Sequence, residues 1–247
     1  MQIGAQLYTV REYCKTLEDF SKTLQKIAGI GYKTVQISGT CAYRPEWLRE
    51  ELSKNGLSCV ITHTPPDRIA AHPDEVAAEH AVFGCRIIGI GHYDLDAVGP
   101  EEFYETFHPA ALALARRGFR LSYHNHDGEF KRDGDIIRLE RLARLFSPRE
   151  LAFTLDTYWV QAGGGDPVWW IRHLAGRTPC IHLKDMAYGG KMAPIGEGNM
   201  NFPDILEACV RSGVEYALVE QDDCYGEDPF DCLAQSFRYL KKFALDA

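Results

Sequence analysis

The chain has 247 residues, of which 45% are hydrophobic and 25% are charged. These values are ordinary for a globular protein and exclude a disordered, collagen-like or coiled-coil chain. The formal net charge is −8, from 27 basic and 35 acidic residues, and this acidity argues against nucleic-acid binding. No apolar run is as long as the ~18 residues that a transmembrane helix needs, so we expect no membrane partner.

The N-terminal segment and the cysteines bear on the cellular location. Residues 1–20 lack the charged leader, apolar core and small-residue cleavage site of a signal peptide. The eight cysteines include no CxxC pair, and several lie in apolar patterns. Reduced, buried thiols of this kind are typical of cytoplasmic proteins. We therefore predict a cytoplasmic protein.

Eight short apolar segments predict eight β-strands. In chain order they are residues 3–10, 32–38, 57–63, 85–91, 120–126, 151–159, 179–186 and 216–222. Between them, apolar residues recur at helical spacing, as at Phe103, Phe107 and Leu114. Glycines stand where a helix passes into the next strand, at Gly31, Gly56, Gly84, Gly118, Gly176 and Gly213. Ser147-Pro148 takes the remaining junction.

Strands that alternate with helices at a period of ~30 residues predict parallel strands joined by right-handed crossovers. Eight such units make a (β/α)₈ TIM barrel, a single domain over residues 1–247. The alternative is an open, doubly wound sheet. A GxGxxG loop does not follow the first strand, which argues against that sheet and against a nucleotide cofactor.

Polar residues stand on one face at the ends of the last four barrel strands. They are His124, Asp156, His182 and Glu220, each about one repeat after the one before. Chemistry in a barrel lies at the carboxyl ends of the strands, so these side chains should stand side by side. Two imidazoles and two carboxylates suit one divalent metal ion. We favour Mn²⁺; Co²⁺, Zn²⁺ and Fe²⁺ also fit, and Mg²⁺ is the least comfortable. The alternative is that each histidine is merely hydrogen-bonded in the core.

Seven segments carry a family resemblance: QLYTVR (6–11), GYKTVQISG (31–39), YHNHDGEF (123–130), LDTYWVQAGGGDP (155–167), HLKD (182–185), IGEGNMNF (195–202) and LVEQD (218–222). In this order they resemble the xylose isomerase-like barrels, often called sugar phosphate isomerase/epimerase proteins. The resemblance implies an enzyme with one metal ligand from each of the fifth to eighth strands. It also implies aldose–ketose isomerisation or C3 epimerisation of a sugar or polyol.

The resemblance carries over residue by residue, with two departures. Asp156, His182 and Glu220 match the family ligands, and Glu220 would also be the proton-transfer base. His124 stands where ketose epimerases have a glutamate, and Trp159 stands where they often have a histidine. A metal-bound imidazole cannot also carry a proton, so His126 is the freer partner acid or base. Glu129, on the loop after the fifth strand, is an alternative partner.

The sequence pattern also allows other functions. A related subgroup with this type of fifth strand acts on 3-keto-glycosides by elimination or hydration, which makes a lyase or hydratase an alternative. A non-catalytic sugar-binding barrel or complex subunit is a second alternative. Apurinic-site endonucleases share the fold, but they need a three-zinc site and a basic face. Barrels of this kind commonly form homodimers or tetramers, so self-association is a further expectation.

Weaker candidates complete the predicted site. Lys184 could hydrogen-bond a developing enolate oxygen, or it could pair with Asp185 or Glu220. Substrate contacts are expected from Tyr8, His63, His92, Trp159 and Glu197. We interpret Gly163–Gly165 as the approach to a helix capped by Asp166, since a carboxylate there would oppose a phosphate.

Overall fold

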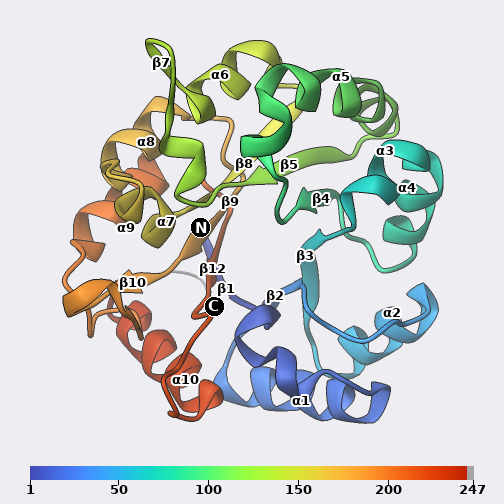
Figure 1. Ribbon diagram of the computed structural model, residues 1–247. Coiled ribbons are helices and arrows are strands. Elements are labelled where there is room, and N and C mark those ends of the chain that lie inside the picture. Colours follow the sequence, from blue (N-terminus) through green and yellow to red (C-terminus); the bar gives the residue numbers. More distant parts are fainter. Residues whose placement is uncertain (244–247) are drawn as a thin grey trace.

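Eight parallel strands form a closed barrel in the computed structural model, which describes residues 1–243 (Figure 1). The strands are β1 (Gln2–Gln6), β2 (Thr34–Ile37), β3 (Ser58–His63), β4 (Ile87–Ile90), β5 (Arg120–His124), β8 (Leu151–Asp156), β9 (Cys180–Leu183) and β12 (Tyr216–Val219). They follow one another around the barrel in chain order, and β1 pairs with both β2 and β12. The predicted (β/α)₈ fold is confirmed, because an open sheet would have two unpaired edges.

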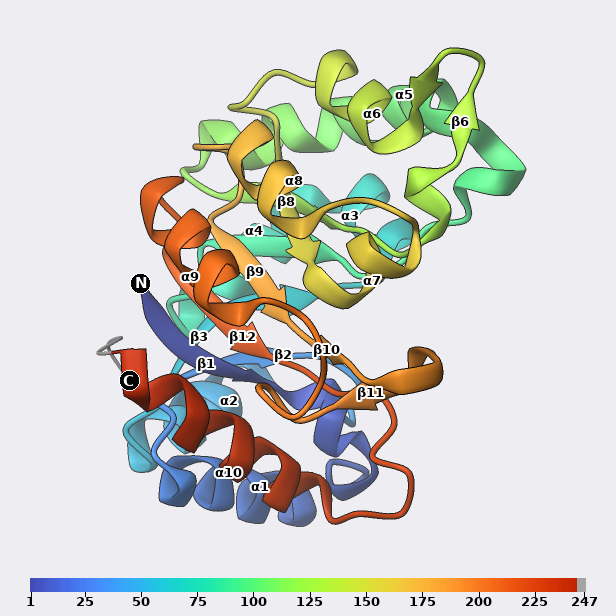
Figure 2. The ribbon, with the colours of Figure 1, turned by 90° about the vertical axis from the view of Figure 1, so that its left-hand side faces the viewer.

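Helices surround the barrel (Figure 1). They are α1 (Leu17–Ile30), α2 (Pro45–Lys54), α3 (Pro66–Ala71), α4 (Pro73–Val82), α5 (Leu95–Arg116), α6 (Arg138–Leu145), α7 (Thr157–Ala162), α8 (Pro167–His173), α9 (Phe202–Arg211) and α10 (Pro229–Leu240). Figure 2 shows α1 and α10 side by side, so the first and last helices close the ring. All six predicted junction glycines have positive φ, between 63° and 122°. Within residues 1–243, no helix is long and apolar enough to cross a membrane.

Short elements lie between the main ones. They are the 3₁₀ helices η1 (Leu7–Tyr13), η2 (Gly128–Phe130), η3 (Tyr188–Gly190) and η4 (Lys241–Phe243), and the two-stranded pairs β6 (Arg132–Asp133) with β7 (Ile136–Ile137) and β10 (Asp185–Met186) with β11 (Met192–Ala193). The helix α8 begins as predicted, because the Asp166 side chain accepts a hydrogen bond from the Val168 amide at 2.9 Å.

Several predicted strands extend too far, the fifth to residue 126 and the eighth to residue 222 among them, and three others stop early for a local reason. The first strand stops at Gln6, whose side chain accepts from the Tyr8 amide and caps η1. The sixth stops at Asp156, because its carboxylate caps α7 by accepting from the Trp159 amide at 3.0 Å. The seventh is interrupted after Leu183, and the chain continues into the β10–β11 hairpin.

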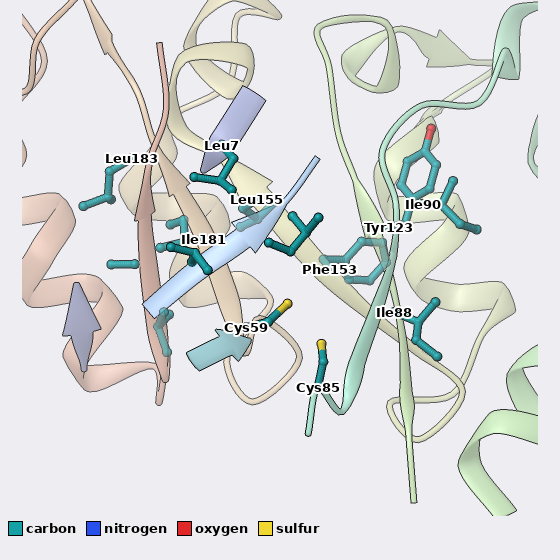
Figure 3. Packing of buried hydrophobic residues seen from close by; sticks show 14 of the residues in the cluster. Leu7, Cys59, Cys85, Ile88, Ile90, Tyr123, Phe153, Leu155, Ile181 and Leu183 are labelled. Atoms are coloured by element: carbon teal, nitrogen blue, oxygen red, sulfur yellow. The ribbon is translucent and has the colours of Figure 1, made fainter. Parts of the chain in front are cut away.

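The hydrophobic core has two parts. The larger part fills the space between the strands and the helices, and Figure 3 shows some of it, including Ile88, Tyr123 and Phe153. A small cluster lines the inside of the barrel: Val60, Ile61, Ile87, Cys180 and Leu218. All eight cysteines are free thiols and six are buried. The barrel interior above the small cluster is left to polar side chains.

A bulge in β3 determines which way His63 points. Val35 pairs with Cys59, but the next residue, Gln36, pairs with Ile61, so Val60 is an extra residue. Cys59 belongs to the larger part of the core, between the strands and the helices, whereas Val60 and Ile61 both belong to the small cluster inside the barrel. The bulge therefore turns the rest of the strand over, and His63 faces the barrel mouth.

Candidate active site

A cavity of about 500 Å³ opens at the carboxyl ends of the strands. Among its lining residues are Tyr8, His63, His92, His124, His126, Trp159, Lys184, Glu220 and Asp222. In a (β/α)₈ barrel this end is where binding and catalysis take place. The cavity therefore lies where the sequence placed the candidate residues.

The four predicted metal ligands meet at the floor of this cavity. They come from β5, β8, β9 and the end of β12, which are neighbours around the barrel. His124, Asp156, His182 and Glu220 each offer one nitrogen or oxygen atom, and these four atoms lie within 4.8 Å of one another. All four side chains are buried, and no other such cluster occurs within residues 1–243. The donor set fits one divalent ion rather than a three-zinc centre.

Hydrogen bonds from outside the cluster orient its members. His124 Nδ1 lies 2.9 Å from the Gly91 carbonyl oxygen, so its Nε2 faces Asp156 Oδ2 at 3.4 Å. His182 Nε2 lies 2.7 Å from Gln36 Oε1, so its Nδ1 faces Glu220 Oε2 at 3.0 Å. Asp156 uses Oδ1 to cap α7, which leaves Oδ2 for the cluster. Each ligand thus presents a defined atom.

The Lys184 ammonium neutralises the carboxylates of the cluster. Its Nζ lies 3.0 Å from Asp156 Oδ2, from Glu220 Oε2 and from both carboxylate oxygens of Asp222. Of the two expected partners, Glu220 pairs with it, whereas Asp185 binds backbone amides instead. A divalent ion in this cluster has to share its carboxylates with an ammonium that is already there.

These contacts determine the charge of each group. Burial alone would raise the pKa of Glu220, but the Lys184 and His182 charges outweigh burial and lower it. Burial alone would lower the pKa of Lys184, but the carboxylates of Asp156, Glu220 and Asp222 outweigh burial and raise it. Burial likewise opposes protonation of His182, yet Glu220 and Asp156 raise its pKa to about 9. Burial, helped by the Glu220 charge, raises the pKa of Asp222 to about 6.

The other predicted site residues either line this cavity or lie outside its lining. Tyr8, His63, His92, His126 and Trp159 all line the cavity, and the His126 ring lies 4.7 Å from that of His124. Burial lowers the pKa of His126 to about 3, so this imidazole is neutral.

Two glutamates lie outside the lining of this cavity. Glu197 is exposed on the loop after β11. Glu129 is buried and accepts hydrogen bonds from the Tyr123 hydroxyl at 2.7 Å and the His126 amide at 2.6 Å. Glu129 therefore stabilises the conformation of the loop after β5.

Two residues of the site received no role from the sequence: Asp222, which was visible at the end of the eighth strand beside Glu220, and Gln36. Asp222 follows Glu220 by two positions, and this alternate spacing was the available signal for it. Gln36 reaches the cluster from β2, three strands away from β9 around the barrel, and nothing in the local sequence pattern relates it to His182.

Comparison with known proteins now identifies the family. The model of the xylose isomerase-like TIM barrel family matches residues 24–243, so the chain belongs to this family. The resemblance seen in the sequence is thereby confirmed. No curated protein sequence matches the chain significantly.

Solved structures share the fold at low identity. A sugar phosphate isomerase/epimerase from Parabacteroides distasonis ATCC 8503 is 23% identical, with 97% of this chain and 93% of that chain covered and a TM-score of 0.83. An L-ribulose 3-epimerase is 12% identical, with 98% and 93% covered and a TM-score of 0.75. The probable 3-DHS dehydratase AsbF from Bacillus anthracis is 15% identical, with 98% and 99% covered and a TM-score of 0.74. At these identities the comparison establishes the fold alone.

Proposed function

We propose that the protein is a divalent-metal-dependent enzyme of the isomerase/epimerase type, acting next to a carbonyl of a sugar or polyol. The observation that carries this proposal is the buried cluster of His124, Asp156, His182 and Glu220 at the floor of an open cavity. These residues would hold the ion, with Mn²⁺ favoured over Co²⁺, Zn²⁺, Fe²⁺ and Mg²⁺. When bound, the ion polarises the carbonyl and makes the neighbouring C–H bond more acidic. The free thiols support a cytoplasmic location.

The side chains around the cluster supply the rest of the chemistry. Glu220 lines the cavity as a carboxylate and is the proposed base for the proton next to the carbonyl. Lys184 donates a hydrogen bond to the oxygen on which negative charge develops. His126 is neutral, lines the cavity and is the proposed second proton carrier.

Unpaired buried nitrogens around the cavity support a polyhydroxylated substrate. His63 Nε2, His126 Nδ1 and Trp159 Nε1 are buried and have no hydrogen-bond partner within the described part of the chain. Leaving such atoms unpaired is unfavourable, and ligand hydroxyl groups would satisfy them. Together with Tyr8 and His92, they form the proposed substrate-binding lining.

A second cavity favours the lyase or hydratase alternative on a 3-keto-glycoside. It has a volume of about 460 Å³ and lies between the ends of β2 and β3 and the helix α4. Five residues line both cavities: Ser38, Gly39, His63, Thr64 and Pro65. Elimination needs room for a departing group, which simple isomerisation does not, and the second cavity offers that room beside the first.

Metal content tests the proposal first. We would purify the protein without a chelator or His-tag and measure its metals by mass spectrometry. We expect about one transition metal ion per chain, lost in His182→Ala and kept in His72→Ala, which removes an exposed imidazole remote from the site. Absence of metal in the unaltered protein, even after soaking in Mn²⁺, Co²⁺ and Zn²⁺, would overturn the proposed site and favour a sugar-binding or subunit role.

Solvent exchange then tests the chemistry. The metal-loaded protein would be incubated in D₂O with a panel of aldoses, ketoses and 3-keto-glycosides and followed by NMR. Deuterium incorporation next to the carbonyl is the expected result, and release of a free alcohol from a glycoside identifies the lyase alternative. Binding of a sugar without either change contradicts an enzymatic role.

A further inference from the structure

The amide of Gln36 is buried in the barrel interior, where an apolar side chain would need no hydrogen-bond partner. The residue has no exposed surface, and its strand neighbours Val35 and Ile37 belong to the larger part of the core, between the strands and the helices. Burying an amide is unfavourable unless it makes hydrogen bonds. Gln36 makes one, between its Oε1 and His182 Nε2, at 2.7 Å. Its Nε2 has no partner within residues 1–243, so the bond to His182 is the only hydrogen bond that the side-chain amide makes in this part of the chain.

This bond determines how His182 can act. An amide oxygen only accepts hydrogen bonds, so Nε2 of His182 must carry a proton. An ion can bind only the neutral imidazole, and the lone pair of that form is then on Nδ1, the atom 3.0 Å from Glu220 Oε2 and 3.6 Å from Asp156 Oδ2. The alternative tautomer would turn an N–H group toward the place where an ion must bind.

The other histidine of the cluster shows the same arrangement by different means. His124 Nδ1 is held by the Gly91 carbonyl oxygen, a backbone acceptor, and its Nε2 faces Asp156. His182 lies deeper, with no exposed surface, and its acceptor is a side chain from β2, three strands away around the barrel. The orientation of His182 therefore depends on one replaceable residue.

We propose that Gln36 is a positioning residue that keeps the proton on Nε2 of His182 and so presents Nδ1 to the metal ion. The inference rests on the proposed metal site, but the imidazole orientation is a property of the chain alone. It can therefore be measured with and without an ion.

Two substitutions at Gln36 test the inference. Gln36→Met keeps the length of the side chain and removes the acceptor, whereas Gln36→Glu keeps an acceptor at the same place. Gln6→Met is the matched control, because Gln6 pairs with Gln36 in the sheet and is equally buried, and its side chain accepts from the Tyr8 amide instead. Circular dichroism and the melting temperature would check that each variant is folded.

Mn²⁺ affinity is the first readout. Loss of an outer partner typically weakens metal binding 10–100-fold, and we expect a loss of about this size in Gln36→Met. Gln36→Glu should stay within a few-fold of the unaltered protein, and so should Gln6→Met. Equal affinity in Gln36→Met, or an equal loss in Gln6→Met, would overturn the inference.

The imidazole NMR signals of the metal-free protein are the second readout and need no bound ion. We expect a slowly exchanging proton on Nε2 of His182, and faster exchange of that proton with solvent in Gln36→Met. A deprotonated Nε2 that accepts from the Gln36 amide instead would overturn the assignment. If the protein binds no Mn²⁺ but shows the protected Nε2 proton, the proposed function fails while the orientation by Gln36 stands.

Discussion

At the scale of single residues, Gly91 serves two histidines at once. A Cβ atom built there would lie 2.6 Å from His63 Nδ1 and 2.7 Å from its Cγ, which is closer than real contacts allow. The carbonyl oxygen of the same residue holds His124. The absence of a side chain at residue 91 thus lets the His63 ring pack against the backbone that orients a proposed metal ligand.

We expect Gly91→Ala to disturb both imidazoles. The added methyl group must displace the His63 ring or the strand, at a cost of about 1–3 kcal/mol in the free energy of unfolding. Mn²⁺ affinity should fall as well, because movement of the backbone shifts the acceptor of His124. Urea unfolding and a metal titration would measure the two effects. Gly29→Ala is the control, since nothing lies within 4 Å of a Cβ there and alanine favours the helix. Unchanged Mn²⁺ affinity in Gly91→Ala would contradict this reading.

The ligand positions could be predicted because they follow from periodicity. In a barrel, alternate residues point inward and repeats are similar in length, so His124, Asp156 and His182 align without any knowledge of contacts. Contacts across the barrel follow no such rule. Gln36 lies 146 positions before His182, and the two meet only because the sheet closes.

At the scale of elements, strand and helix boundaries were the part that the sequence predicted least well. The run LDTYW has the apolar alternation of a strand, yet its last three residues belong to α7. Asp156 is the cause, because its side chain caps the helix while its other oxygen faces the cluster. The helix–strand junctions were predictable, since the positive φ values there favour glycine and glycine is visible in the sequence.

The loop over residues 195–200 depends on one buried carboxylate. Asp185 accepts hydrogen bonds from the amides of Gly196 at 2.9 Å, Gly198 at 3.0 Å and Met200 at 3.3 Å, as well as from Met186 at 2.8 Å. The side chain has no exposed surface. A single residue thus connects the β10–β11 hairpin to the segment that precedes α9.

Asp185→Ala should therefore release this loop. Four amides lose a charged acceptor, and we expect the free energy of unfolding to fall by about 3–5 kcal/mol. Limited proteolysis should cut the variant within residues 195–200 before the rest of the chain. Asp204→Ala, which removes an exposed carboxylate in the first turn of α9, should change stability by less than about 1 kcal/mol. Equal stability of the two variants would show that water replaces the carboxylate at little cost.

At the scale of the whole molecule, the cluster links the four adjacent strands that make up one half of the barrel. Its ligands come from four adjacent strands that are separated by long stretches of chain, from His124 to Glu220. An ion that binds these residues only in the folded protein adds its binding free energy to the stability. At a free Mn²⁺ concentration 100 times Kd the gain is about 2.7 kcal/mol. For a chain of this size that corresponds to a rise of roughly 5–10 °C in melting temperature.

The rise in melting temperature should also depend on Lys184. Its ammonium lies 3.0 Å from Asp156 and Glu220, so the metal-free cluster is already compensated and an incoming ion gains only the difference. Lys184→Met removes that compensation, and we expect a lower melting temperature without metal but a larger increase on adding Mn²⁺ than in the unaltered protein. Calorimetry after chelator treatment, with and without Mn²⁺, measures both quantities, and His182→Ala should show no increase. An equal increase with and without Lys184 would mean that the ion and the ammonium do not share these carboxylates.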